Sequence, residues 1–346
     1  MLKDNFLRVI DYMRISITDR CNLRCIYCMP ADGVFPCGHK DILRYEEIIR
    51  VVRIAAGLGV RKIRLTGGEP LTRKNVVFLI SSLKAVMGIE DLSMTTNGVL
   101  LEKYSDEIAS AGLDRVNISL DSFLPERYRE ITRTGELQTV LRGISAAEKA
   151  GLLPIKINMV PMKGINDAEI EAFARLTIDS DYQVRFIELM PSACIDFWSP
   201  ERYIEAEQIR EKIEDLGPLE PVRPRKKGPS RYFRLKGARG VVGFISALSH
   251  HFCEDCNRLR LTADGKLRPC LFSESEIDLK SPLRNGAPDS EIARLLRLAV
   301  QVKPEGHHFR NLSPDALLSA KSRKMAGSPT SSTGSSGNRP MSKIGG

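Results

Sequence analysis

Six of the eight cysteines in this 346-residue chain fall into two short clusters, and their spacing is the feature best suited to chemistry. The clusters comprise Cys21, Cys25 and Cys28, and Cys253, Cys256 and Cys270. Thiolates are strong ligands for iron and zinc, and clustered cysteines in a reducing compartment indicate a metal centre rather than disulfides. Cys37 and Cys194 stand alone and are expected to be small buried apolar residues.

The first cluster has the form C-x3-C-x2-C, with no fourth cysteine or histidine inside its loop. A structural zinc ion takes four protein ligands, whereas a [4Fe-4S] cluster held by three thiolates keeps one iron open for another ligand. We therefore interpret this loop as an open iron-sulfur site. The alternative is a zinc site completed by Cys37 or His39, which follow the loop.

The second cluster has the form C-x2-C-x13-C and lies in a predicted loop and hairpin. His250 or His251 would complete a zinc site, so this pattern alone indicates zinc and an open iron-sulfur cluster about equally. Arg258 and Arg260 are two residues apart within the cluster. A strand would place both guanidinium groups on one face, where they can bind phosphate oxygens.

Short β-branched runs alternate with amphipathic stretches, as in βαβ units around a parallel sheet. The six predicted strands are 13–17, 62–65, 91–95, 115–120, 155–160 and 183–188. The clearest helical patterns, with apolar residues at three- and four-residue intervals, cover 45–58, 76–87, 137–150, 167–178 and 203–216. Six such units form either an incomplete barrel or an open doubly wound sheet.

In both architectures the functional residues gather at the carboxyl ends of the strands. Three unusual motifs lie there: Thr66-Gly67-Gly68-Glu69-Pro70, Ser119-Leu120-Asp121 and Glu188-Leu189-Met190-Pro191. The paired glycines of the first motif let the backbone approach a ligand closely. The sequence thus predicts a ligand site beside the first cysteine cluster.

The pattern divides the chain into three parts. Residues 1–216 are the predicted α/β core, and residues 217–325 are a smaller module that carries the second cysteine cluster. Residues 326–346 are a predicted flexible tail, because 326–340 is rich in Ser, Gly, Thr and Pro. The chain ends in Gly345 and Gly346.

The formal net charge of +9 suits a polyanionic ligand, either nucleic acid or a small phosphorylated molecule. The basic run 223–239 has only Tyr232 and Phe233 as aromatic residues, so a stacking surface for RNA is poorly supported. No signal-peptide pattern opens the chain, and no segment approaches the roughly 18 apolar residues of a membrane span. We expect a cytoplasmic protein that binds neither nucleic acid nor membrane.

Four motifs occur together and in order: RISITDRCN at 14–22, TGGEPL at 66–71, TTNG at 95–98 and CEDCNRLR at 253–260. Together they resemble the GTP 3′,8-cyclase family of molybdenum cofactor biosynthesis, within the radical S-adenosylmethionine superfamily. The likeness runs from about residue 7 to 308 and resumes at the final glycines, while 326–340 is longer than the family's compact ending. It implies an α/β fold: an incomplete (β/α)6-type TIM barrel, a smaller C-terminal α+β module and a flexible tail.

The resemblance also implies residue roles. Each cysteine triad would hold a [4Fe-4S] cluster, and S-adenosylmethionine would contact Tyr27, Gly68, Ser119 and Met190. GTP would contact Arg14, Arg64, Thr95, Lys156, Arg258, Leu259 and Arg260, with its guanine on the open iron of the second cluster. Catalysis would also involve Arg258, Arg260, Gly345 and Gly346.

The family reaction supplies the implied chemistry. A 5′-deoxyadenosyl radical removes the ribose 3′ hydrogen of GTP, and the carbon radical attacks guanine C8. The resemblance further implies a homodimer, a reductant protein and a downstream cyclic pyranopterin monophosphate synthase. Two alternatives remain: a radical enzyme that modifies a peptide, and a non-catalytic zinc protein that binds RNA through residues 223–239.

Overall fold

The computed structural model describes residues 1–35, 37–38, 40–191, 197–223 and 228–307. The predictions for His39, Cys194, the segment 326–340, Gly345 and Gly346 fall outside these ranges. The division of the chain at residues 216 and 325 stays a prediction.

Six parallel strands are neighbours in the sheet in chain order, as the repeated βα pattern predicts. They are β1 (Tyr12–Ser16), β2 (Lys62–Thr66), β3 (Asp91–Thr96), β4 (Arg115–Ser119), β5 (Lys156–Met159) and β6 (Gln183–Ile187). Each agrees with its predicted strand to within one residue at either end. Sequential parallel order is the arrangement of a barrel, so the doubly wound alternative is wrong.

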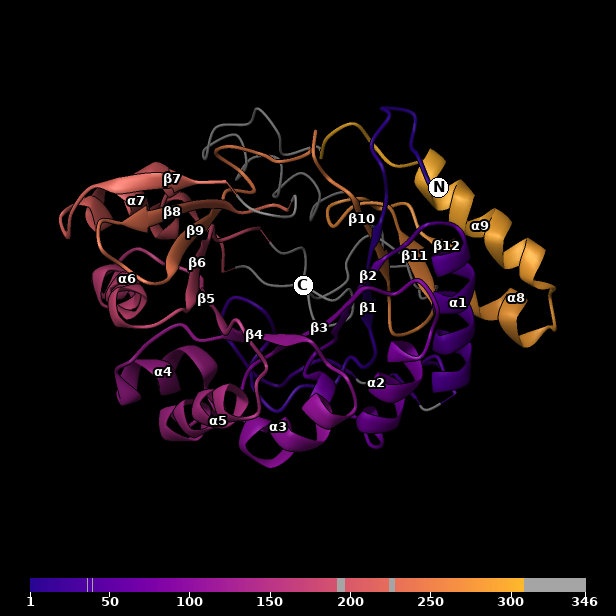
Figure 1. Cartoon of the computed structure of the whole chain (residues 1–346), viewed down its shortest axis with the longest axis horizontal. Helices are drawn as coiled ribbons and strands as arrows, with labels where there is room; N and C mark the ends of the chain where they lie inside the picture. Colours follow the sequence, from indigo (N-terminus) through magenta and orange to yellow (C-terminus); the bar gives the residue numbers. More distant parts are fainter. Residues whose placement is uncertain (36, 39, 192–196, 224–227, 308–346) are drawn as a thin grey trace.

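The helices that connect these strands lie on the outer side of the curved sheet (Figure 1). They are α1 (Tyr45–Gly57), α2 (Val76–Lys84), α3 (Leu101–Ser110), α4 (Pro125–Thr132), α5 (Leu137–Lys149) and α6 (Ile170–Asp179). The sequence pattern does not predict α3 and α4. The helix α4 is only eight residues long, and α3 buries Ser105 where the pattern needs an apolar residue.

The C-terminal strands extend the same sheet at both edges. β10 (Arg258–Leu261) pairs in parallel with β1, and β9 (Val241–Ile245) pairs in parallel with β6. Beyond them run antiparallel strands: β8 (Arg231–Leu235) and β7 (Leu219–Val222) on one side, β11 (Lys266–Arg268) and β12 (Ile277–Asp278) on the other. The described residues thus form one twelve-stranded sheet with β7 and β12 at its edges, so the barrel stays open.

One hydrophobic core joins the barrel strands to the C-terminal helices, which are α7 (Ala206–Glu214), α8 (Lys280–Arg284) and α9 (Asp289–Gln301). The core includes Ile15 of β1, Leu259 of β10 and Leu296 of α9, all fully buried. Burying such a side chain contributes about 1.5–3 kcal/mol. The shared core therefore holds the barrel strands and these three helices together.

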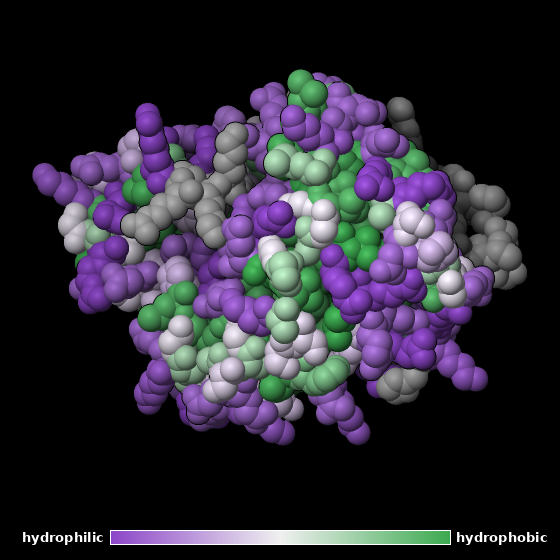
Figure 2. Space-filling view, turned by 45° about the vertical axis from the view of Figure 1, so that its right-hand side comes forward, coloured by the Kyte–Doolittle hydropathy of each residue, from purple (hydrophilic) through white to green (hydrophobic). Residues whose placement is uncertain are grey.

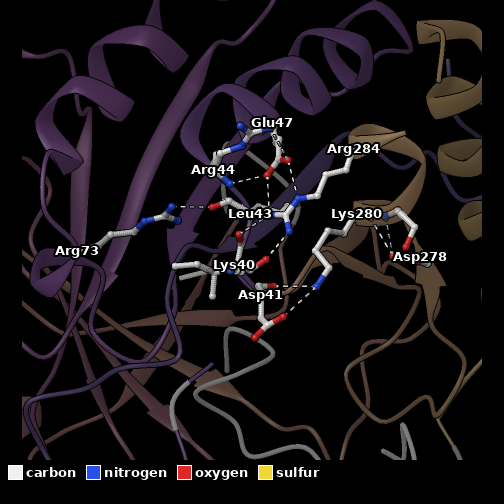
Figure 3. Close-up of polar contacts among 11 residues, drawn as sticks. Lys40, Asp41, Leu43, Arg44, Glu47, Arg73, Asp278, Lys280 and Arg284 are labelled. Atoms are coloured by element: carbon white, nitrogen blue, oxygen red, sulfur yellow. Dashed lines mark hydrogen bonds and ion pairs between the residues drawn. The ribbon is translucent and has the colours of Figure 1, made fainter. Parts of the chain in front are cut away.

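Helix α8 is also tied to the loop before α1 by polar contacts (Figure 3). Arg284 donates hydrogen bonds to the carbonyl oxygens of Lys40 and Ile42, the latter at 2.9 Å. Its Nε lies 3.0 Å from the Glu47 carboxylate at the start of α1. These contacts fix the second module against the segment that follows the first cysteine cluster.

Most of the face in Figure 2 is hydrophilic, with hydrophobic residues gathered in its central part. Among the helices of the described residues, none combines the length and the hydropathy that crossing a bilayer requires.

Candidate active site

A cavity of about 900 Å³ occupies the inner side of the open sheet and is lined by residues from all six barrel strands. Nearly all of the described residues that the sequence singles out line it: Arg14, Cys21, Cys25, Tyr27, Cys28, Arg64, Gly68, Thr95, Ser119, Lys156, Met190, Cys253, Cys256, Arg258, Arg260 and Cys270. Leu259 is different, because its side chain belongs to the hydrophobic core. Its role in substrate binding stays a prediction.

The two cysteine clusters lie at opposite ends of the parallel strands. Cys21 follows the carboxyl end of β1, whereas Cys256 precedes β10, whose first residue Arg258 is paired with Tyr12 at the start of β1. Since β10 runs parallel to β1, residues that precede β10 lie at the amino ends. The expectation that the whole site sits at the carboxyl ends is right for the first cluster and wrong for the second.

The turn after β2 packs directly against the segment that leads into the first cluster. The amide of Gly68 donates to the carbonyl of Thr18 and that of Glu69 to the carbonyl of Arg20, both at 2.8 Å. A Cβ atom on Gly68 would lie 2.2 Å from the Arg20 oxygen, so only glycine fits there. The paired glycines therefore position the cysteine loop in addition to lining the cavity.

Glu69 fixes this turn from inside the protein. It is buried and accepts hydrogen bonds from the amides of Leu71 (3.1 Å) and Asn97 (2.7 Å) and from the hydroxyl of Thr96 (2.8 Å). Burial raises the pKa of Glu69 to about 7 in spite of these bonds. Its carboxylate thus links the turn after β2 to the end of β3.

Tyr27, next to the last cysteine of the first cluster, is held by a carboxylate at the end of β4. Its hydroxyl donates to Oδ2 of Asp121 at 2.7 Å, and Oδ1 of Asp121 accepts from the Val160 amide at 2.8 Å. Burial raises the pKa of Asp121 to about 6. The Tyr27 hydroxyl is therefore engaged within the protein, which leaves its ring and backbone to face the cavity.

The thiols of the first cluster are crowded and shielded from water. Burial, followed by the neighbouring Cys28, raises the pKa of Cys25 well above its usual value, and burial also raises the pKa of Cys21. Such thiols ionise readily only when a metal compensates their charge. The donor set, three sulfur atoms at the end of a cavity, fits a [4Fe-4S] cluster with one open iron.

The second cluster is assembled by the β10–β11 hairpin. Cys256 precedes β10 and Cys270 follows β11, so the antiparallel pairing brings both to the open end of the hairpin. Burial would raise the pKa of Cys256, but the cations of Arg258 and Lys303 outweigh it and lower the pKa to about 6. A thiol that ionises near neutral pH is well prepared to bind a metal.

Zinc is a poor fit to both clusters. Across the described ranges, no group of three or more His, Cys, Asp or Glu side chains converges on one metal-ion position. This disfavours a single zinc ion held by either triad, including the site completed by His250 or His251. A [4Fe-4S] cluster differs because each cysteine binds a separate iron atom, so the three thiols need not converge on one point.

Between the two clusters the cavity wall is strongly cationic. Burial and the adjacent Arg260 lower the pKa of Arg14 well below its usual value. Burial and Arg185 are the main causes that lower the pKa of Lys156 to about 6. Cations held so close together in a buried site favour a polyanionic ligand, such as a triphosphate.

Several lining residues escape the sequence analysis, chiefly Lys62, Arg115 and Arg185. Arg185 is only 5% exposed, and its Nε makes no hydrogen bond within the described part of the chain. Arg115 is paired with Asp91 at 2.8 Å. The sequence does contain a pattern that could have identified these arginines. Each lies two or four residues from another cavity residue on its strand, so both side chains point to the same face. Charged side chains are rarely buried inside a barrel unless they bind a ligand.

Comparisons with known proteins identify the family of this chain. Residues 15–177 match the family model of the radical SAM superfamily, and residues 182–309 match that of Molybdenum Cofactor Synthesis C. A solved structure of Streptococcus suis SuiB bound to S-adenosylmethionine has a TM-score of 0.61 at 14% identity, over 89% of this chain and 79% of that chain. That likeness concerns the fold alone.

Sequence relatives are much closer. The GTP 3′,8-cyclase of Thermodesulfovibrio yellowstonii is 52% identical over 92% of this chain and 99% of its own length. The GTP 3′,8-cyclase of Moorella thermoacetica is 54% identical over 90% of this chain and 96% of its own length. The alternatives of a peptide-modifying radical enzyme and of a zinc protein that binds RNA are therefore wrong. The chain belongs to the GTP 3′,8-cyclase family of radical S-adenosylmethionine enzymes.

Proposed function

We propose that this chain converts GTP to (8S)-3′,8-cyclo-7,8-dihydroguanosine 5′-triphosphate, the first step of molybdenum cofactor biosynthesis, with S-adenosylmethionine and two [4Fe-4S] clusters. The observation that carries the proposal is a cavity with a cysteine triad at each end and buried cations between them. One triad suits radical generation, and the cations suit the triphosphate.

The residues that would hold the cofactors are those that the family resemblance implies, and all of them line the cavity. Cys21, Cys25 and Cys28 would hold the first cluster, and S-adenosylmethionine would lie against Tyr27, Gly68, Ser119 and Met190. Bound there, the cluster and S-adenosylmethionine would supply a 5′-deoxyadenosyl radical. The protein itself would orient the ribose 3′ hydrogen toward that radical and exclude water from the cavity.

The substrate would lie across the middle of the cavity. Arg14, Arg64, Lys156 and Arg185 would bind the triphosphate by charge-assisted hydrogen bonds. Thr95 would contact the nucleoside, and Cys253, Cys256 and Cys270 would hold the second cluster, which would bind the guanine. Arg258 and Arg260 would fix the base and phosphates while guanine C8 and ribose C3′ join, and Gly345 and Gly346 would complete the catalytic set.

The direct test is anaerobic incubation of iron- and sulfide-reconstituted protein with reductant, S-adenosylmethionine and GTP, read by mass spectrometry. We expect both 5′-deoxyadenosine and the cyclised nucleotide. Cys253→Ala should keep S-adenosylmethionine cleavage but lose the cyclised nucleotide, whereas Cys25→Ala should lose both. Equal loss of cleavage in the two variants would contradict the proposed division of labour.

The proposal extends to partners and location. We infer that the protein works as a cytoplasmic homodimer, receives electrons from a reductant protein and passes its product to cyclic pyranopterin monophosphate synthase. Size-exclusion chromatography with light scattering tests the dimer: a single species of twice the 38.6 kDa chain mass is expected. A coupled assay with the synthase tests transfer of the product.

A further inference from the structure

The open end of the β10–β11 hairpin is bridged by a buried lysine from a distant part of the chain. Lys303, which follows α9, is only 3% exposed. Its Nζ donates to the carbonyl of Arg258 at 2.9 Å and to that of Pro269 at 2.6 Å. These carbonyls lie two residues after Cys256 and one residue before Cys270. The lysine therefore sets the spacing of the two strands that bring these cysteines together.

A buried arginine from the other end of the chain fixes the third cysteine. Arg8, only 8% exposed, donates from Nη1 to the carbonyl of Cys253 at 2.7 Å. The same guanidinium donates to the carbonyls of Glu305 (2.7 Å) and Pro304 (2.6 Å), next to Lys303. The segment 303–305 is thus joined to the backbone around all three cysteines.

The two cations differ in how their charge is balanced. Nε of Arg8 lies 2.6 Å from the buried carboxylate of Asp4. Within the described residues Lys303 makes no ion pair with a carboxylate, and its Nζ instead donates to the two carbonyls of the hairpin that carries Cys256 and Cys270. A buried ammonium group needs compensation for its lost water, and a thiolate-bound centre on this triad would add negative charge beside it.

We propose that Lys303 is a positioning residue of the second cluster: it holds Cys256 and Cys270 at the distance the cluster needs and places its amino group beside the cluster, while Arg8 holds Cys253. The inference rests on the proposed function for the identity of the cluster, but its test does not depend on GTP turnover. Partners of this kind that orient metal ligands typically change metal affinity by about 10- to 100-fold when they are removed.

Helix α8 offers a matched control. Arg284 also donates to two backbone carbonyls, those of Lys40 and Ile42, but these carbonyls lie on the segment between the first cluster and α1 (Figure 3). Removal of the Arg284 side chain also removes hydrogen bonds to backbone carbonyls, but these bonds are not at the second triad. Comparison of Lys303→Met with Arg284→Met therefore separates an effect on the cluster from a general loss of stability.

The experiment uses the full chain with Cys21, Cys25 and Cys28 replaced by alanine, so that only the second triad can take up iron. We expect Lys303→Met to lose iron to a chelator about 10-fold faster than the parent. The reduced cluster should show altered electron paramagnetic resonance g-values and a more negative midpoint potential. Lys303→Arg, which keeps the charge, should restore the potential, and Arg284→Met should match the parent in all three measurements.

Several outcomes would overturn the inference. One is a Lys303→Met protein with unchanged iron release, g-values and potential, and another is a parent triad that takes up zinc in place of iron. If Lys303→Met does not fold, Lys303→Gln and Arg8→Lys provide the same comparison, with thermal unfolding as the check. If the cluster responds to Lys303→Met as expected but the intact enzyme forms no cyclised nucleotide, the result contradicts the proposed function and still supports the role of Lys303.

Discussion

Arg14 and Arg260 are direct partners in the parallel pairing of β1 with β10, so two guanidinium groups enter the cavity side by side. Burial and Arg258 lower the pKa of Arg260 to about 10, and burial and Arg260 lower the pKa of Arg14 well below its usual value. The sheet therefore places like charges near one another in a buried part of the cavity. A polyanion that bridges them relieves this repulsion and gains affinity.

Replacement of one member of the pair should affect substrate binding and protein stability in opposite directions. We expect Arg260→Gln to weaken GTP binding by about 10- to 100-fold, because it removes charge-assisted hydrogen bonds. The nucleotide-free protein should become more stable by about 1 kcal/mol, since a buried cation that is repelled by Arg258 is removed. Isothermal titration calorimetry and thermal unfolding measure the two effects. Lower stability together with unchanged GTP affinity would contradict the assignment.

Lys156 should couple GTP binding to proton uptake. Burial and Arg185 lower its pKa to about 6, so it is mostly neutral at higher pH, and a bound triphosphate raises its pKa. Between pH 7.5 and 9, where the terminal phosphate is fully ionised, GTP affinity should therefore fall as pH rises, by up to about tenfold per unit.

Calorimetry in buffers with different ionisation enthalpies counts the protons taken up. Lys156→Met should remove the uptake, whereas Lys212→Met should keep it, because Lys212 pairs with Asp167 outside the cavity. Uptake that survives in Lys156→Met would assign the proton to another group.

Gly68 should be needed for loading of the first cluster. In Gly68→Ala the new methyl group would meet the backbone of Arg20 and push the loop that carries Cys21. We expect the reconstituted variant to lose about half of its iron, together with S-adenosylmethionine cleavage. Gly57→Ala is the control, because no atom lies within 4 Å of a Cβ there. Full iron content in Gly68→Ala would show that the loop tolerates the shift.

Arg185 should bind the triphosphate although no sequence motif marks it. We expect Arg185→Met to raise the Kd for GTP by about 10-fold or more while iron content and S-adenosylmethionine binding stay normal. Arg239→Met is the control, since Arg239 pairs with Asp181 on the surface. Equal effects of the two variants would mean that Arg185 acts only through overall charge.

The sequence predicts the fold well where the determining pattern is local. The six barrel strands appear within one residue of their expected bounds, because hydrophobic periodicity and turn residues act over a few positions. Helix α4 escapes prediction for the same reason: eight residues starting at Pro125 are too few to show a period. The way the sheet continues beyond β1 and β6 could not be predicted from local patterns. It depends on β10 and β9, which pair with these strands although they lie far away in the chain.

The amino-acid sequence by itself determines the first cysteine triad and the glycine turn, since ligands a few residues apart form one loop whatever surrounds them. The tertiary structure alone decides that the second triad sits at the amino ends of the strands, that Arg14 faces Arg260, and that Lys303 and Arg8 hold the cysteine backbone. These relationships join residues up to 246 positions apart. They arise from strand order and shared burial, which no local pattern encodes.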